Sequence, residues 1–226
     1  MGYLPVNIAV GGRPCLVVGG GSVGERKVMG LLEYEARVRL VSRDLTPTLV
    51  SLTEQGAVQY LGPEYKPEYL DGAALVFAAT NDTELNTRVS REAAGRGIPV
   101  NVADVPELCT FYLPAWIKRG HLTVSVSTSG RSPALAAHLR SRLEDEFGPE
   151  YGRFLELMGR IRPRVLAEGR DHRHNRDLFR RLVESDILDN LARNEPVRVE
   201  ARLVEMLGPG YTLASLGFEA LEGETA

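Results

Sequence analysis

Cysteine is scarce in this chain of 226 residues, which contains only Cys15 and Cys109 and no C-x-x-C pair. That scarcity argues against a disulfide framework and against a zinc or dithiol redox site. Cys15 opens an apolar segment and is expected to be a small core residue. Cys109 falls in a polar stretch, so it is expected to lie in a loop where it could be exposed.

Long apolar runs and an excess of one charge are missing as well. No run approaches the roughly 20 apolar residues that cross a bilayer. Met1 to Asn7 lack the basic and apolar regions of a signal peptide, so a cytoplasmic protein is expected. The net charge of −3 at pH 7 gives no reason to expect nucleic acid or an anionic membrane as a partner. No internal repeat or low-complexity segment is present.

What the sequence does contain is a glycine-rich turn after its first apolar segment. Val17-Val18 is followed by Gly19-Gly20-Gly21-Ser22-Val23-Gly24, which meets the spacing G-x-G-x-x-G of dinucleotide sites. In such sites Gly19 would allow the tight turn, Gly21 the approach of a pyrophosphate, and Gly24 the close packing of the next helix. The helix N-terminus would offer free N–H groups to the phosphates. The motif alone is also compatible with a turn shaped only by packing.

Strand and helix patterns alternate through the first 113 residues. Segment 73–79 is apolar throughout, as in a strand that is buried on both faces. The alternation predicts an α/β fold with a doubly wound, Rossmann-type parallel sheet and right-handed crossovers. Strands are expected at 13–19, 37–41, 57–61, 73–79 and 98–102, and helices at 24–35, 47–55 (capped by Thr46) and 82–95.

The pattern changes near residue 114. Strands at 111–118 and 121–127, joined by Arg119-Gly120, predict a β-hairpin. Ser132 and Pro133 are typical of a helix start, so a helix is expected at 134–147. Charged helices are expected at 151–168, 177–194 and 196–207, and the tail after Gly217 is expected to fray. These patterns predict three parts: 1–113, 114–147 and 148–226.

Four segments directly follow strands of the predicted sheet. Because ligands of open parallel sheets bind beyond the carboxyl ends of the strands, these segments should line one crevice. Their convergence favours a dinucleotide site and makes Ala79, Thr80, Asn81 and Val102 candidate cofactor contacts. The segments are 19–24, Ser42-Arg43-Asp44, Ala79-Thr80-Asn81 and Asn101-Val102-Ala103-Asp104.

Two aspartates in these segments are candidates for specific roles. Asp44 lies where an acid would bind a ribose 2′-hydroxyl, whereas Ser42 and Arg43 would suit a 2′-phosphate, so the residues alone leave NAD and NADP open. Asp44 could also be a turn residue before Thr46. Asp104 should lie near the nicotinamide end, where a carboxylate could act as a general base or hold the proton of an imino nitrogen. Its alternative role is a cap for segment 105–108.

Histidines and arginines cluster in the predicted helical part. His172 and His174 form an H-x-H pair that could bind a metal, but the flanking Arg170 and Arg173 favour a solvated loop. The arginines between residues 153 and 181 are expected to form mostly a solvated face. They could also help to hold a polycarboxylate substrate.

Several further motifs occur in a fixed order along the chain. They are Leu4-Pro5, Cys15 through Lys27, Ala78-Ala79-Thr80-Asn81-Asp82, Asn101 through Asp104, Phe111-Tyr112-Leu113-Pro114-Ala115 and Ser127 through Ala136. In this order and spacing they resemble the precorrin-2 dehydrogenases, which include the N-terminal module of siroheme synthase and its free-standing relatives. The resemblance covers residues 3 to 147.

The resemblance implies an NAD-binding Rossmann domain, a central dimerisation segment and a helical C-terminal domain, in a homodimer formed through residues after Leu113. It implies oxidation of precorrin-2 to sirohydrochlorin with NAD⁺, and some relatives also insert Fe²⁺ to give siroheme. The key aspartate of the family falls on Asp104, for proton handling and, where present, chelation. The family's cofactor contacts fall on Ser22 and Val23 and on Arg43 and Asp44.

The chain also departs from the fused enzymes. Thr128 and Ser129 stand where those enzymes usually have serine and glycine, so no role is assigned to that turn. Residue 226 leaves no room for a methyltransferase module, so precorrin-2 is expected to come from a separate enzyme. Two alternatives stay open: a nucleotide-sensing module without activity, and a chelatase with a vestigial nucleotide site. The first leaves the hairpin and the helical part unexplained, and the intact glycines argue against the second.

Overall fold

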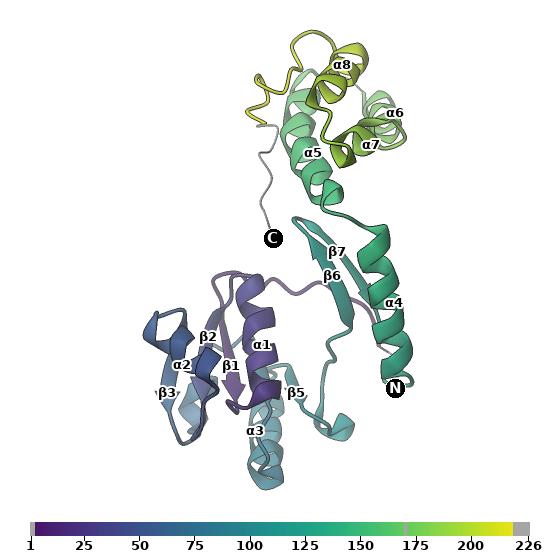
Figure 1. Ribbon diagram of the computed structural model, residues 1–226. Coiled ribbons are helices and arrows are strands. Elements are labelled where there is room, and N and C mark those ends of the chain that lie inside the picture. Colours follow the sequence, from purple (N-terminus) through teal and green to yellow (C-terminus); the bar gives the residue numbers. More distant parts are fainter. Residues whose placement is uncertain (1–2, 170, 219–226) are drawn as a thin grey trace. The chain divides into compact units, whose positions relative to one another are not determined.

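The computed structural model describes residues 3–169 and 171–218. It consists of two compact units, one up to Leu113 and one from Pro114 onward, and each is described by itself (Figure 1). A further division of the second unit near residue 147 stays a prediction. Most of the tail beyond Gly217, for which fraying was predicted, lies outside the described residues. None of the described helices is long and apolar enough to cross a membrane.

The first unit is built on a five-stranded parallel sheet in the order β3-β2-β1-β4-β5. This order confirms the predicted doubly wound α/β fold. The strands have three to five residues each. They are β1 Pro14–Val18, β2 Arg37–Val41, β3 Val58–Gly62, β4 Leu75–Ala78 and β5 Val100–Val102.

Both faces of this sheet are covered. Alternate residues of β1 point to opposite faces, so Val17 packs in one apolar cluster and Leu16 in another. The cluster of Val17 includes Val28 and Leu49 from the helices α1 and α2, whereas that of Leu16 includes Val89 from α3. The helices are α1 Ser22–Glu33, α2 Pro47–Glu54 and α3 Thr83–Gly95, with short 3₁₀ turns η1 Pro67–Leu70 and η2 Pro106–Leu108.

Short polar side chains set the helix starts that matter for the site. The Thr46 Oγ1 accepts a hydrogen bond from the Leu49 N–H (3.3 Å), which confirms the predicted cap of α2. Asp82 caps α3 in the same way through Leu85 (2.9 Å). Helix α1 begins at Ser22 rather than at the predicted residue 24, because Gly21 takes the extended N-cap conformation. The N-terminus of α1 therefore lies inside the glycine turn itself.

The second unit begins with an antiparallel hairpin of β6 Ala115–Arg119 and β7 Leu122–Val126. The helix α4 Pro133–Glu146 lies against both strands, and the Ser132 Oγ caps it by accepting from the Leu135 N–H (3.2 Å). The hairpin and the cap were both predicted. The turn falls one residue later than predicted, since Arg119 remains in β6 and Gly120 takes a positive φ of 55°.

Four helices follow: α5 Glu150–Ala167, α6 His172–Val183, α7 Ile187–Ala192 and α8 Pro196–Leu207. The prediction of one helix over 177–194 is wrong. The Ser185 hydroxyl donates to the Leu182 carbonyl (2.7 Å) and accepts from the Ile187 N–H (3.4 Å). These local bonds compete with the helical ladder and separate α6 from α7.

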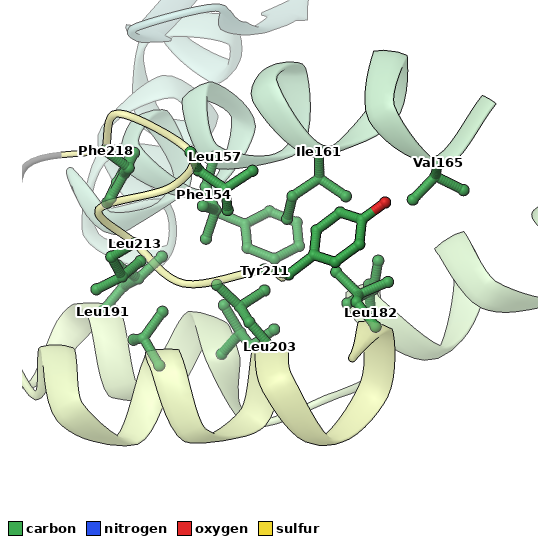
Figure 2. Close-up of a cluster of buried hydrophobic side chains, with 14 of the residues drawn as sticks. Phe154, Leu157, Ile161, Val165, Leu182, Leu191, Leu203, Tyr211, Leu213 and Phe218 are labelled. Atoms are coloured by element: carbon green, nitrogen blue, oxygen red, sulfur yellow. The ribbon is translucent and has the colours of Figure 1, made fainter. Parts of the chain in front are cut away.

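An apolar core holds these four helices together (Figure 2). Leu157 and Ile161 from α5 are fully buried, as are Leu182 from α6 and Leu203 from α8. The segment after α8 returns across this core and contributes residues that include Tyr211, whose ring lies among the labelled side chains of Figure 2. Full burial of one such leucine or isoleucine stabilises the fold by about 1.5–3 kcal/mol.

Candidate functional site

The glycine turn joins β1 to α1 at the carboxyl edge of the sheet. Gly19 has a φ of +118°, and a Cβ there would overlap the backbone carbonyl of Ala79. A Cβ at Gly24 would overlap the Gly19 carbonyl, so Gly24 lets α1 close on the end of β1. A Cβ at Gly21 would meet nothing within 4 Å. The turn is therefore closely packed on its protein side and open at the glycine that a pyrophosphate would approach.

Gly20, which the spacing rule does not include, connects the turn to the end of β2. Its N–H donates to the Ser42 Oγ (2.9 Å), and its carbonyl accepts from the Thr46 N–H (3.1 Å). A Cβ at Gly20 would lie 2.5 Å from the Asp44 carbonyl oxygen. Sequence reasoning missed this position, although the run of three consecutive glycines was a usable signal.

Asp44 lies in the loop that Gly20 holds. The Ser42 hydroxyl donates to the Asp44 carbonyl (2.7 Å), which fixes the backbone of this loop. The side chains of Arg43 and Asp44 are exposed. Thr46, not Asp44, caps α2, so the structure gives Asp44 no capping role. The Asp44 carboxylate is left available to a ligand at the end of β2.

The loop after β4 is held by a buried amide. Asn86 of α3 is 4 % exposed, its Nδ2 donates to the Thr80 carbonyl (2.9 Å), and its Oδ1 accepts from the Thr80 hydroxyl (2.8 Å). The Ala79 N–H donates to the Val18 carbonyl (2.7 Å), which continues the β1–β4 ladder by one residue. Ala79, Thr80 and Asn81 thereby keep a fixed backbone next to the glycine turn. The role of Asn86 was not predicted.

Asp104 follows β5 with a positive φ of 60°. A left-handed backbone at a residue other than glycine costs about 1–2 kcal/mol, and such strain clusters at functional sites. The Asp104 side chain is exposed, and within the described part of the chain no hydrogen bond or ion pair of this carboxylate is found. The alternative role as a cap is not supported, because the N-cap of η2 is Val105.

Cys109 lies beneath the Asp104 loop. Its Sγ is 3.2 Å from both the N and the O of Val102 and 3.4 Å from the Val105 carbonyl oxygen. Cys109 lies in a loop, as expected, and its thiol is partly buried and connects the two sides of this loop. Burial raises the pKa of the Cys109 thiol. Its neutral form suits a structural role better than a nucleophilic one.

Strand register places these segments along one edge of the sheet. Val18 of β1 pairs with Val41 of β2 and with Ala78 of β4, and Ala78 pairs with Val102 of β5. The four strands therefore end at the same level. The glycine turn, the Asp44 loop, the Thr80 loop and Asp104 come together as predicted for the carboxyl ends of parallel strands.

Lys27, for which no role was predicted, also lies near this edge of the sheet. Lys27 is half-buried on α1, and its Nζ lies 5.7 Å from the centroid of the Phe77 ring. Burial lowers the pKa of the Lys27 ammonium, with a further decrease from Arg26, whereas Cys109 and Asp104 raise it. The ammonium thus lies within electrostatic reach of Asp104.

The histidine pair of the second unit is placed differently from the prediction. His172 and His174 lie in the first turn of α6, not in a loop, because the Asp171 carboxylate caps the helix through the His174 N–H (2.8 Å). Neither they nor other described residues form a group of three or more His, Cys, Asp or Glu that could hold a metal. Arg162, Arg173 and Arg176 line an open basic pocket beside Phe179.

Two family models match the chain in succession. Residues 6–115 match the family described as "Putative NAD(P)-binding", and residues 119–146 match "Sirohaem biosynthesis protein central". The first match covers the whole parallel sheet and its carboxyl edge. It confirms the expectation of a dinucleotide-binding domain.

Siroheme synthases of two bacteria are similar to this chain in sequence. The siroheme synthase of Methylobacillus flagellatus is 46 % identical over 165 residues, which are 73 % of this chain and 35 % of that protein. That of Pseudomonas aeruginosa is 38 % identical over 223 residues, 99 % of this chain and 48 % of the relative. The chain is homologous to part of siroheme synthase. It spans about half the length of these relatives or less.

A solved structure supports the fold beyond the family models. The protein titled "SirC, precorrin-2 dehydrogenase" superposes on this one with a TM-score of 0.67. The match covers 88 % of this chain and 100 % of the other at 23 % sequence identity. It confirms the predicted succession of a Rossmann-type sheet, a small antiparallel sheet and helices.

Proposed function

We propose that this protein is an NAD-dependent dehydrogenase that oxidises precorrin-2 to sirohydrochlorin in siroheme biosynthesis. The observation that carries the proposal is the position of Asp104, an exposed carboxylate on a left-handed backbone at the sheet edge that also holds the glycine turn. The homology to siroheme synthase supplies the substrate class.

The residues at this edge fit a dinucleotide. Gly21 leaves open space on the ligand side, and the N–H groups of Ser22 and Val23 at the start of α1 suit a pyrophosphate. Asp44 would accept a hydrogen bond from a ribose hydroxyl, which favours NAD over NADP. The backbones of Thr80 and Val102 would line the path toward the nicotinamide end. When bound, NAD⁺ supplies the hydride acceptor.

Asp104 would accept the proton that the same reaction releases. Conversion of precorrin-2 and NAD⁺ to sirohydrochlorin and NADH releases one proton, and a carboxylate beside the reacting carbon can accept it and pass it to water. Within the described residues the side chain has no protein partner to displace. A general base of this kind contributes about 10²–10⁴-fold to the rate.

The proposal includes three further predictions. Insertion of Fe²⁺ into sirohydrochlorin at the same site, a homodimer formed through residues after Leu113, and a cytoplasmic location are all predicted. The side chain of Leu135 on α4, which is 49 % exposed, supports an apolar contact with a second copy. Chelatase activity is measured with sirohydrochlorin and Fe²⁺ in the absence of NAD⁺.

The test of the proposed activity is an assay of the purified protein with enzymatically made precorrin-2. With NAD⁺ present, NADH absorbance and the sirohydrochlorin spectrum should appear together in equal amounts. Folded protein that binds NAD⁺ but yields neither product would overturn the proposal in favour of a nucleotide-sensing module. Metal insertion without dehydrogenation would favour the chelatase alternative.

A further inference from the structure

The side chain of Lys27 extends from α1, the helix that follows the glycine turn, to Phe77 of β4. It lies on α1, five residues after Ser22, and its ammonium is 5.7 Å from the ring centroid of Phe77 on β4. Phe77 pairs in register with Asn101 on β5, three residues before Asp104. The Lys27 ammonium therefore lies over β4, the neighbour of β5, and Asp104 is among the groups that act on it electrostatically.

The Phe77 ring under the Lys27 ammonium packs against a second aromatic ring that is itself held in place. The rings of Phe77 and Phe111 meet edge to face with centroids 5.5 Å apart. The Nδ2 of Asn101 donates to the Phe111 carbonyl (3.1 Å), and Asn101 is only 8 % exposed. A cation held above such a platform loses little further freedom when it binds an anion, so binding there is favoured.

Lys27 has no anionic partner close enough to neutralise it. In residues 3–169 and 171–218 no carboxylate lies within 4.0 Å of its Nζ, and no hydrogen bond of this group is found. Asp104 raises the pKa of the Lys27 ammonium, but burial and Arg26 outweigh it and lower that pKa overall. A half-buried cation without a partner is unfavourable in the free protein, and an incoming carboxylate would relieve that cost.

We propose that Lys27 binds a carboxylate of the tetrapyrrole substrate and so holds the macrocycle next to Asp104. This inference rests on the proposed function. Precorrin-2 carries acetate and propionate groups around its ring, so a carboxylate is available at any edge. A phosphate of the dinucleotide is the less suitable partner, because Gly21 and Asp44 follow β1 and β2, whereas the Lys27 ammonium lies over Phe77 of β4, the strand that pairs with β5.

The test compares Lys27→Met, which removes only the charge, with Lys27→Arg, which keeps it. Arg26→Met is the matched control, because Arg26 is the exposed neighbour on the same helix. Loss of one charge-assisted hydrogen bond should raise the KM for precorrin-2 about 10- to 100-fold in Lys27→Met. The KM for NAD⁺ should stay within about twofold, Lys27→Arg should recover most of the loss, and Arg26→Met should behave as the unchanged protein.

A direct titration with sirohydrochlorin, followed by its visible absorbance, should show the same order of affinities without any turnover. Thermal melting verifies that each variant is folded, and Lys27→Gln, which also removes the charge, replaces Lys27→Met if that variant is not. An unchanged KM for precorrin-2 in Lys27→Met, or an equal rise for NAD⁺, overturns the inference. Absence of NADH formation by the unaltered protein would instead overturn the proposed function.

Discussion

Gly24 lies directly against the carbonyl group of Gly19, so that a Cβ at position 24 would overlap the Gly19 oxygen. Gly21, between them, is surrounded by open space on its Cβ side. The glycines of one motif therefore serve different purposes. Gly19 and Gly24 are required for the fold of the β1–α1 connection, whereas Gly21 is required only when a ligand is present.

This difference predicts two distinct phenotypes. Gly24→Ala should lower the free energy of unfolding by about 1–3 kcal/mol, because the added methyl group forces α1 away from β1. Gly21→Ala should change stability by less than about 1 kcal/mol but weaken NAD⁺ binding at least about tenfold, because the methyl group occupies the approach of the pyrophosphate. Thermal unfolding and NAD⁺ titration of the two variants separate these effects. Equal losses of stability in both variants would contradict the assignment.

Asp44 should determine the choice of cofactor. Asp44→Ala removes the acceptor for a ribose 2′-hydroxyl and a negative charge that would repel a 2′-phosphate. We expect NAD⁺ affinity to fall about 10-fold or more while NADP⁺ affinity rises or stays unchanged. Glu54→Ala, which removes an exposed carboxylate at the last residue of α2, is the matched control. Titration with both nucleotides checks the prediction, and an Asp44→Ala protein that binds NAD⁺ normally would exclude this role.

The helical part contains an ion pair whose effect depends on pH. Arg202 of α8 donates from its Nε to the Oδ1 of Asp186 (2.7 Å), just before α7, and lowers the pKa of that carboxyl. A lowered folded-state pKa stabilises the fold above the unfolded value of about 3.9. That contribution is lost as the pH falls through the folded-state pKa.

Asp186→Asn should therefore lower the Tm at neutral pH, by only about 1–4 °C because the pair is exposed. The difference from the unaltered protein should disappear in acid, because a protonated Asp186 is neutral like the asparagine that replaces it. Melting curves across this pH range test the prediction. Arg202→Gln is the partner control; it also removes the ion pair of Arg202 with Glu205 (2.7 Å), so its Tm should fall at least as far at neutral pH. A difference that persists in acid would point to a cause other than these ion pairs.

Local chemistry explains why much of the fold could be predicted. The apolar segment 73–79 contains a strand that is buried on both faces, and the caps Thr46 and Ser132 mark helix starts through bonds to residues three positions on. Such signals need no knowledge of distant residues. The break between α6 and α7 was missed because the apolar spacing continues through it. The bonds of the Ser185 hydroxyl to Leu182 and Ile187 lie at this break.

The site was predicted where it follows from topology and missed where it follows from tertiary contacts. Parallel strands that end at one level bring Gly19, Asp44 and Asp104 together, and the order of the strands suffices to predict this. Gly20 was missed because its partner Ser42 lies 22 residues away in the sequence. The role of Cys109 was missed because its contacts with Val102 and Val105 form only when the loop after β5 has folded. Lys27 likewise acquires a role only once α1 is packed over β4.

The central claim is that Asp104 handles the proton of a dehydrogenation. The most direct test compares NADH formation from precorrin-2 by the unaltered protein and by Asp104→Asn. Asparagine tolerates the left-handed backbone at this position, so the loop should keep its shape. The account predicts that turnover falls at least about 100-fold while the Kd for NAD⁺ stays within about twofold. Turnover of Asp104→Asn at the unaltered rate would contradict it.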